Sequence, residues 1–257
     1  MAVLNFKGKE IHYHCIGDPN SPCLLFLHGY MESSTMWKKF HYLQNRYYLI
    51  FIDLPGHGSS DVIYRKHSMP LQAHIAQQIL NKQGIQKAKI IGHSMGGYIG
   101  LAMAKYYPNY CDEIILINSH PFADDPVKIL QRKAALLIVS RNKDRYCTLL
   151  IPNLFIHPER HPEEIKTLIK EAKEMTEEGI IAAVKGMMSR ADYQSFLKQK
   201  SIKCSYILGA QDEIIPHPEI IEKVFPDSPV FILKDAGHMS HIEDWENCKN
   251  SLEKLLD

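Results

Sequence analysis

The sequence predicts an α/β fold in which one mostly parallel sheet of eight strands is flanked by helices. Three observations lead to this prediction. The apolar runs in the first half of the chain are continuous rather than alternating, which is typical of parallel strands covered on both faces. Segments with apolar residues at helical spacing separate these runs. At 257 residues, the chain is long enough for a single sheet with an insertion.

The expected strands and helices follow one another in a regular order. Two alternating segments at residues 3–6 and 10–15 flank Lys7-Gly8-Lys9 and suit a short antiparallel hairpin. Six further apolar runs are expected to complete the sheet, at residues 23–27, 48–52, 88–91, 113–118, 204–209 and 230–233. Helices are expected between and after them, at residues 34–43, 70–84, 98–107 and 243–256.

The alternation of strand and helix breaks between residues 122 and 195, where helical patterns continue without a convincing strand. We expect residues 122–195 to form a helical cap, inserted into a core made of residues 1–121 and 196–257. Within the cap, residues 149–155 and 180–188 are rich in apolar side chains. One face of the cap is therefore expected to be buried, and part of it to line a substrate pocket.

Composition and charge exclude several classes of partner. The 30 Lys and Arg against 29 Asp and Glu leave a formal charge of +1, so no broad basic face is available for nucleic acid. No stretch approaches the length of a membrane span, and residues 1–10 carry charges where a signal peptide needs apolar residues. The six cysteines have no paired spacing and indicate reduced thiols. We expect a cytoplasmic protein without a nucleic-acid or membrane partner.

The segment Gly92-His93-Ser94-Met95-Gly96 is a G-x-S-x-G motif between an apolar strand and a helix rich in small residues. A serine in this context lies on a tight turn that exposes its hydroxyl, and the glycines leave room where a Cβ would obstruct the backbone. The turn also places Ser94 at a helix N-terminus, where the unpaired Met95 amide can hold a developing oxyanion. The motif therefore predicts Ser94 as a nucleophile.

With this motif, the chain resembles the α/β-hydrolase superfamily over essentially its whole length, and in particular its small carboxylesterase and non-haem perhydrolase-like members. Two further segments carry the resemblance, at residues 26–30 and 53–60. In the family, the residue after the His-Gly pair of the first segment gives the second oxyanion amide, and Tyr30 stands there. The second segment matches a tight structural loop. The resemblance implies an α/β-hydrolase fold with a helical cap.

A serine nucleophile needs a histidine that accepts its proton near neutral pH and returns it to the leaving group. His238 follows the last apolar strand, where the resemblance puts the catalytic histidine, and Gly237 gives this loop its freedom. His241 lies three residues further on and remains a second candidate. The sequence therefore predicts His238 as the base.

The third member should be a carboxylate that orients the histidine, and in this family it lies between the nucleophile and the histidine in the chain. Asp212 fits this order and follows the strand at residues 204–209, in a segment that resembles the family's acid loop. Glu213 is adjacent but is expected to point elsewhere. Asp124 or Asp125 could serve instead if the acid is displaced, as in some relatives.

These residues predict a serine hydrolase that cleaves carboxylic esters through an acyl-enzyme on Ser94. The substrate is expected to be a small molecule, an ester with an apolar acyl group, because the cap carries apolar candidates for the pocket. The candidate pocket residues are His28, Leu150, Phe155 and Met187, although His28 is also expected to hold a loop by hydrogen bonds. No phosphate loop or plausible metal-ligand set occurs in the sequence, so no metal or cofactor is expected.

Two alternative functions keep the same residues. Relatives with this triad also cleave carbon-carbon bonds or eliminate small acids from carboxylated substrates, and fold and triad do not separate these reactions from ester hydrolysis. Such a substrate would need cationic side chains, and the cap offers Arg132, Arg141, Arg145 and Arg190. A hydrolase-like receptor for a small molecule is the other alternative. The acyl-chain preference and the oligomeric state stay open at this point.

Overall fold

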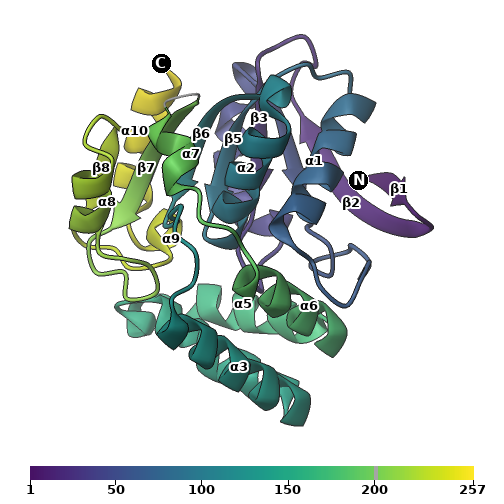
Figure 1. Ribbon diagram of the computed structural model, residues 1–257, viewed down its shortest axis with the longest axis vertical. Coiled ribbons are helices and arrows are strands. Elements are labelled where there is room, and N and C mark those ends of the chain that lie inside the picture. Colours follow the sequence, from purple (N-terminus) through teal and green to yellow (C-terminus); the bar gives the residue numbers. More distant parts are fainter. Residues whose placement is uncertain (200–201) are drawn as a thin grey trace.

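The computed structural model describes residues 1–199 and 202–257, and its centre is one eight-stranded sheet (Figure 1). The strand order is β1-β2-β4-β3-β5-β6-β7-β8. β1 pairs with β2 and β2 with β4 in antiparallel fashion, and all other neighbours are parallel. The predicted fold class is therefore confirmed. The strands are β1 (Ala2–Phe6), β2 (Lys9–Ile16), β3 (Cys23–Leu27), β4 (Tyr48–Ile52), β5 (Ala88–His93), β6 (Cys111–Ile117), β7 (Lys203–Gly209) and β8 (Val230–Leu233).

Helices cover both faces of this sheet, as Figure 1 shows. The first face carries α1 (Met69–Lys82), α2 (Met95–Tyr106), α7 (Gln194–Lys198) and α8 (Pro218–Val224). The second face carries η1 (Ser34–Asn45) and α10 (Trp245–Leu256), with the short α9 (Ser240–Glu243) before α10. The segment expected as a helix at 34–43 is thus helical, but as a 3-10 helix that extends to Asn45.

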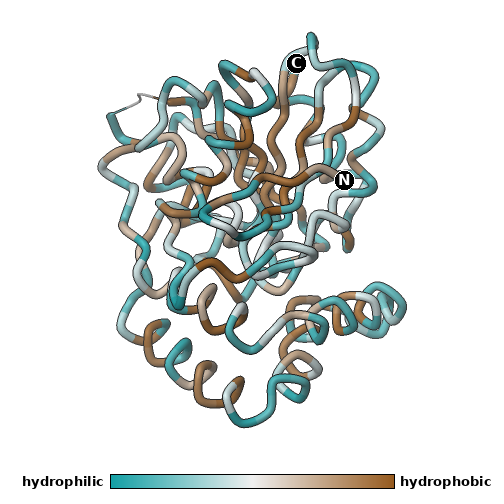
Figure 2. Tube along the Cα trace, turned by 90° about the vertical axis from the view of Figure 1, so that its right-hand side faces the viewer, coloured by the Kyte–Doolittle hydropathy of each residue, from teal (hydrophilic) through white to brown (hydrophobic). Residues whose placement is uncertain are grey.

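The continuous apolar runs are explained by burial on both faces of the sheet. Every residue of β3 is buried: Leu25 and Leu27 pack on the face of α1 and α2, whereas Leu24 and Phe26 pack against η1 and α10. Figure 2 shows the central strands as hydrophobic segments surrounded by more polar chain. None of the described helices is long and apolar enough to cross a membrane.

Besides the short 3-10 helices η3 (Ile151–Leu154) and η4 (Pro158–Arg160), the chain between β6 and α7 forms four α-helices that lie at one end of the sheet (Figure 1). We call these helices the helical insertion: α3 (Pro126–Arg141), α4 (Lys143–Leu150), α5 (Pro162–Glu174) and α6 (Glu177–Met188). They share a hydrophobic cluster of their own, which Met31 and Met239 join from the sheet side. The His67 amide also donates to the Ala182 carbonyl at 3.0 Å and ties α6 to the core. The exact division at residues 122 and 195 stays a prediction.

Candidate active site

Three side chains from three loops meet at the carboxyl edge of the parallel strands. Ser94 follows β5, Asp212 follows β7 and His238 follows β8. The Oγ of Ser94 lies 2.9 Å from Nε2 of His238, and Nδ1 of His238 lies 2.8 Å from Oδ2 of Asp212. The structure therefore brings the three predicted residues into one hydrogen-bonded chain, although they are far apart in sequence.

The turn that carries Ser94 has a strained backbone. Ser94 adopts φ +49° and ψ −115°, a region that residues with a Cβ avoid. Its amide donates to the Ile117 carbonyl at 3.0 Å, and the Ser119 hydroxyl donates to the Ser94 carbonyl at 2.7 Å. A Cβ on Gly92 would come within 2.5 Å of the Gly97 nitrogen, and one on Gly96 would meet the Leu27 carbonyl. The glycines of the motif therefore let strand, turn and helix approach closely.

Asp212 is held in its ionised form by the groups around it. Oδ2 accepts from the Asn118 amide at 2.8 Å, and Oδ1 accepts from the Ile214 backbone amide at 2.8 Å. Burial alone would raise the pKa of Asp212, but the facing His238 and these hydrogen bonds outweigh it and lower the pKa below the ordinary value. A carboxylate so fixed can orient the imidazole and stabilise its protonated form.

The two residues predicted to supply the oxyanion amides lie on two different loops, one directly after the serine and one lining the same cavity. Met95 is the first residue of α2, so its amide has no acceptor within the helix, and its side chain is buried in the core. Tyr30 lies in the loop after β3, and it lines the same cavity as Ser94. The following residue, Met31, has φ +64° and turns the chain away towards η1. The donors that could face an oxyanion are thus backbone groups of two different loops.

The other candidates for base and acid lie elsewhere. His241 is buried between Trp37 and His93, and its ring is 4.9 Å from the ring of His93. Asp125 caps the N-terminus of α3 by accepting from the Lys128 amide at 2.7 Å. Glu213 is exposed. Each of these side chains therefore has a structural place of its own.

A cavity of about 410 Å³ opens above Ser94, between the sheet edge and the helical insertion. Of the four predicted pocket residues, Leu150 and Met187 line it. The prediction was wrong for the other two. Phe155 packs inside the cluster of the insertion, and His28 is fully buried below the site, where Nε2 accepts from the Leu54 amide at 2.9 Å. An apolar run in the sequence predicts burial, but not which side of a helix the burial is on.

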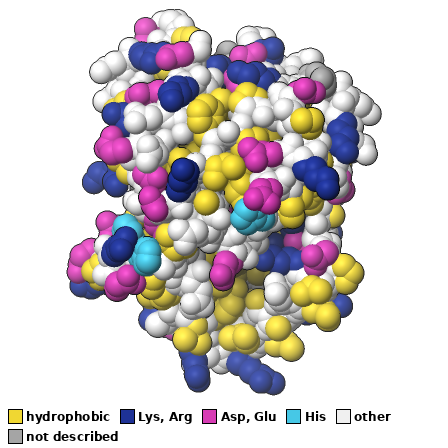
Figure 3. Space-filling view, turned by 90° about the vertical axis from the view of Figure 1, so that its left-hand side faces the viewer, with side chains coloured by type: hydrophobic (Ala, Val, Ile, Leu, Met, Phe, Trp, Pro, Cys, Tyr) yellow, Lys and Arg dark blue, Asp and Glu magenta, His cyan; other side chains and the backbone are white. Residues whose placement is uncertain are grey.

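The cavity is mostly apolar, and its apolar character continues to the surface. Among the described residues that line it are Tyr98, Ala134, Ala135, Ile138, Leu154, Val184 and Ile214. Figure 3 shows hydrophobic side chains gathered on the lower part of the molecule, where the helical insertion lies. The exposed ones there include Val127, Leu130, Leu137, Ile138 and Leu149. Ile138 belongs to both sets, so the exposed apolar face of α3 borders the cavity.

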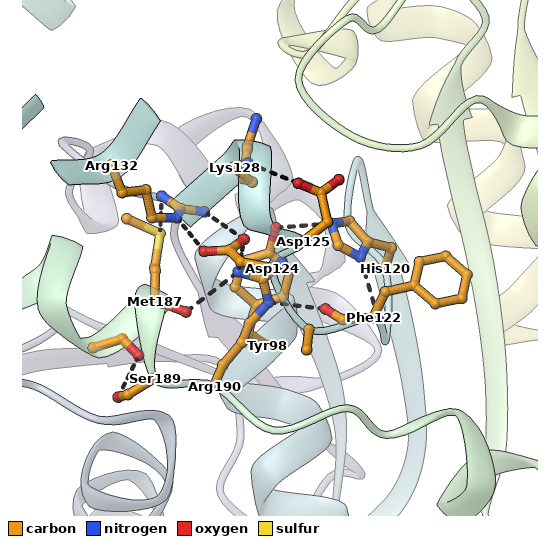
Figure 4. Close-up of polar contacts among 12 residues, drawn as sticks. Tyr98, His120, Phe122, Asp124, Asp125, Lys128, Arg132, Met187, Ser189 and Arg190 are labelled. Carbon is orange, nitrogen blue, oxygen red and sulfur yellow. Dashed lines mark hydrogen bonds and ion pairs between the residues drawn. The ribbon is translucent and has the colours of Figure 1, made fainter. Parts of the chain in front are cut away.

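One side of the cavity is cationic, and Figure 4 shows how its charges lie. Asp124 is fully buried and takes an ion pair from each of two arginines, Arg132 and Arg190, both at 2.5 Å. Lys128 donates to the Ile214 carbonyl at 2.9 Å, and burial, with the nearby Arg132, lowers its pKa. Lys128 and Arg132 line the cavity. Two arginines therefore pair with one carboxylate beside a third cation, Lys128, and Lys128 and Arg132 face the substrate space.

Sequence reasoning missed three residues that complete the site. Asn118 has φ +46° and donates to both Asp212 and the Gly237 carbonyl. Glu32 and His93 form a buried pair next to the nucleophile, with Nδ1 of His93 3.0 Å from Oε2 of Glu32. Two signals in the sequence could have indicated these residues: Asn118 stands at the end of a predicted strand, and His93 stands inside the motif.

Comparison with known proteins agrees with this architecture. A family model described as the alpha/beta hydrolase fold matches residues 22–153. A solved structure of a thermophilic esterase from Thermogutta terrifontis, with malate bound, is 28% identical, covers 96% of this chain and 93% of its own, and has a TM-score of 0.88.

Two enzymes from curated collections of sequences are also similar. A 2-hydroxy-6-oxononadienedioate/2-hydroxy-6-oxononatrienedioate hydrolase from Burkholderia vietnamiensis is 27% identical over 96% of this chain and 90% of its own length. A putative 2-succinyl-6-hydroxy-2,4-cyclohexadiene-1-carboxylate synthase from Bacillus subtilis is 26% identical over 95% of this chain and 94% of its own. The similar proteins thus span more than one reaction.

Proposed function

Because this chain belongs to the alpha/beta hydrolase fold family, we propose that it is a serine hydrolase that cleaves carboxylic esters through an acyl-enzyme. The observation that carries the proposal is the chain of hydrogen bonds from Ser94 through His238 to Asp212, at the floor of a largely apolar cavity. The similarity to a thermophilic esterase over almost the whole chain supports it. The apolar lining favours an uncharged acyl group.

The geometry suggests the order of events. Oγ of Ser94 attacks the ester carbonyl carbon while Nε2 of His238 takes the hydroxyl proton, and the carbonyl oxygen becomes an oxyanion that the Tyr30 and Met95 amides hold. The imidazolium then gives this proton to the leaving alkoxide, which departs as an alcohol. A water molecule repeats the sequence on the acyl-enzyme, with His238 again as base, and releases the acid. Asp212 keeps Nδ1 protonated throughout.

The test uses p-nitrophenyl esters of graded chain length with wild type and Ser94→Ala, together with a fluorophosphonate label located by mass spectrometry. We expect label on Ser94, turnover of the esters and a loss of turnover by about a millionfold in Ser94→Ala, because the nucleophile is gone. Ser140→Ala, an exposed serine on α3, is the matched control and should retain full activity. Full activity of Ser94→Ala would overturn the proposal.

A second candidate function is the hydrolysis of a carbon-carbon bond in a carboxylated substrate. One observation favours it: Lys128 and Arg132 line the cavity, and a carboxylate could lie against their cationic groups. The names of the two similar enzymes from Burkholderia vietnamiensis and Bacillus subtilis also denote carboxylated molecules. The candidates differ in the substrate bond, not in the triad.

A direct competition separates the two candidate functions. Wild type is offered p-nitrophenyl butyrate and a carboxylated vinylogous diketone under the same conditions. Turnover of the ester with no response to the diketone supports ester hydrolysis. Label on Ser94 with diketone cleavage and no ester turnover would replace it by carbon-carbon hydrolysis.

A further inference from the structure

His93, the residue before the nucleophile, is buried between two hydrogen-bond acceptors. Its Nε2 lies 2.9 Å from the backbone carbonyl oxygen of His238, and its Nδ1 lies 3.0 Å from Oε2 of Glu32. Only 1% of the side chain of His93 and 2% of that of Glu32 is exposed. A carbonyl oxygen can only accept, so Nε2 must carry a proton. The remaining question is which partner holds the proton between Nδ1 and Oε2.

The surroundings put that proton on the imidazole. Burial alone would raise the pKa of Glu32, but the facing His93 and its hydrogen bond lower the pKa to about 2. Burial alone would lower the pKa of His93, but the charge of Glu32 and the two acceptors raise it. The neighbouring His241 is instead kept neutral, because burial and the charge of His93 lower its pKa to about 3. The pair is therefore ionic, with His93 as an imidazolium.

The same carboxylate oxygen holds a third loop. Oε2 of Glu32 also accepts from the backbone amide of Gly29 at 2.6 Å, and Gly29 directly precedes Tyr30. A Cβ on Gly29 would meet Glu32 and would lie 2.7 Å from Nδ1 of His93, so only glycine leaves room for the pair. One ion pair thus connects the loop after β3, the residue before Ser94 and the backbone of His238.

We infer that Glu32 and His93 are a positioning pair, which fixes the proposed oxyanion loop and the histidine loop relative to Ser94. Neither side chain reacts. The pair acts through the Gly29 amide on one side and the His238 carbonyl on the other. The inference depends on the proposed function only for the roles of Tyr30 and His238. A misplacement of reacting groups by about 1 Å costs on the order of a hundredfold in rate, so the loss of this pair should reduce turnover.

The experiment compares Glu32→Gln with Glu113→Gln. Glu32→Gln keeps the shape of the side chain and removes its charge, whereas Glu113 is an equally buried carboxylate at the amino end of β6, paired with Lys89 and Lys203. We expect Glu32→Gln to lower kcat for p-nitrophenyl butyrate about tenfold to a hundredfold with KM within about twofold, since the pair acts on geometry at the transition state. Glu113→Gln should lower the melting temperature and leave kcat within about twofold.

A spectroscopic measurement detects the ion pair without a substrate. In protein carrying ¹⁵N-labelled histidine, the ring of His93 should lose its second proton with a midpoint above pH 6.5 in wild type and below pH 6.5 in Glu32→Gln. The rate of fluorophosphonate labelling at Ser94 should fall at least about fivefold in the same variant. These two measurements hold even if the protein cleaves no ester.

Two results would overturn the inference. One is a wild-type His93 that titrates below pH 6.5, because the ion pair would then not exist. The other is a Glu32→Gln variant that loses stability as Glu113→Gln does but keeps the wild-type kcat and labelling rate, because the pair would then only stabilise the fold. Failure of ester turnover in wild type contradicts the proposed function instead, and leaves the titration to decide on the pair.

Discussion

The carboxyl edge of the sheet and the helical insertion both bury charged side chains, but they balance the charge differently. At the edge, each buried carboxylate faces a histidine: Asp212 faces His238, and Glu32 faces His93. In the insertion, Asp124 is the one carboxylate of a cluster with Arg132, Arg190 and Lys128. At the edge, each buried carboxylate is therefore matched by one imidazole, whereas the insertion keeps an excess of positive charge beside the cavity.

The difference indicates what each region can do. A buried pair with all its hydrogen bonds satisfied fixes the geometry of the loops that share it. A buried cluster with excess charge is stabilised by an added anion, because desolvated like charges raise the free energy of the site. The edge is thus suited to orient reacting groups, and the insertion to select among substrates. The following changes test this contrast.

The largest effect is expected from Asp212→Asn. The amide keeps the shape of the carboxylate but can donate to Nδ1 of His238, which favours the wrong tautomer of the imidazole. We expect kcat for p-nitrophenyl butyrate to fall about ten-thousandfold, measured in the steady state, while the protein stays folded by circular dichroism.

Asp124→Asn is the matched control, the same change at a buried carboxylate of the insertion. It leaves the Arg190 guanidinium, 2% exposed, without its partner, so the free energy of unfolding should fall by about 3 kcal/mol. Its kcat should fall less than about tenfold. Equal losses of kcat in both variants would mean that Asp124 contributes to catalysis as much as Asp212 does, and would remove the contrast between the two regions.

Much of the fold could be predicted from the sequence, because a strand that is buried on both faces of the sheet consists of consecutive apolar residues. The five residues of β3 and the five of β4 are all buried, and both strands appear in the sequence as unbroken apolar runs. The order of the strands in the sheet follows from packing between distant segments, and no local pattern encodes it.

The site shows the same division. Ser94 lies in a motif of five consecutive residues, so local sequence was enough to find it, although the contact that requires Gly96 comes from the distant Leu27 carbonyl. The pair of Glu32 with His93 joins positions 61 residues apart, and although His93 stands inside the motif, nothing local indicates Glu32 as its partner. Phe155 was assigned to the pocket because an apolar run does not tell the cavity side of a segment from its core side.

A smaller effect is expected from Lys128→Met, which removes one of the two cations that line the cavity. The test compares p-nitrophenyl hexanoate with the mono-p-nitrophenyl ester of adipic acid, which differs by a terminal carboxylate. We expect the preference of the enzyme for the anionic over the neutral ester, as a ratio of kcat/KM, to fall about fivefold, because a half-buried charge pair contributes about 1 kcal/mol.

Lys133→Met is the control for this change, since Lys133 is exposed on the same helix and is not among the residues that line the cavity. It should leave the ratio unchanged. If Lys128→Met alters kcat/KM for both esters by the same factor, the excess positive charge of the insertion does not select an anionic substrate. The insertion would then resemble the edge, with its cations serving to hold Asp124 and the Ile214 carbonyl.

The smallest effect concerns the pH dependence of stability, and it tests whether Glu32 and His93 form a charge pair at the edge. The pKa of Glu32 is about 2 in the folded chain, below its ordinary 4.5, so its contribution is complete above pH 4.5 and disappears as pH falls towards 2. The pKa of His93 is raised, so its contribution is complete below pH 6.5 and disappears as pH rises through the folded value.

Urea unfolding of wild type and Glu32→Gln over a pH series should therefore give a stability difference with a plateau between about pH 4.5 and 6.5, which declines on both sides. The other ionisable groups around the pair are present in both proteins, so their contributions largely cancel in the difference; they are His28, His238, His241, Asp212 and Lys39. If the unfolding free energies of the two proteins differ by a constant amount from pH 3 to 8, the proton between Glu32 and His93 lies on Glu32. The two side chains then form a neutral hydrogen bond and not a charge pair. Glu32 and His93 would then both be uncharged, and the contrast with the insertion would rest on Asp212 and His238 alone.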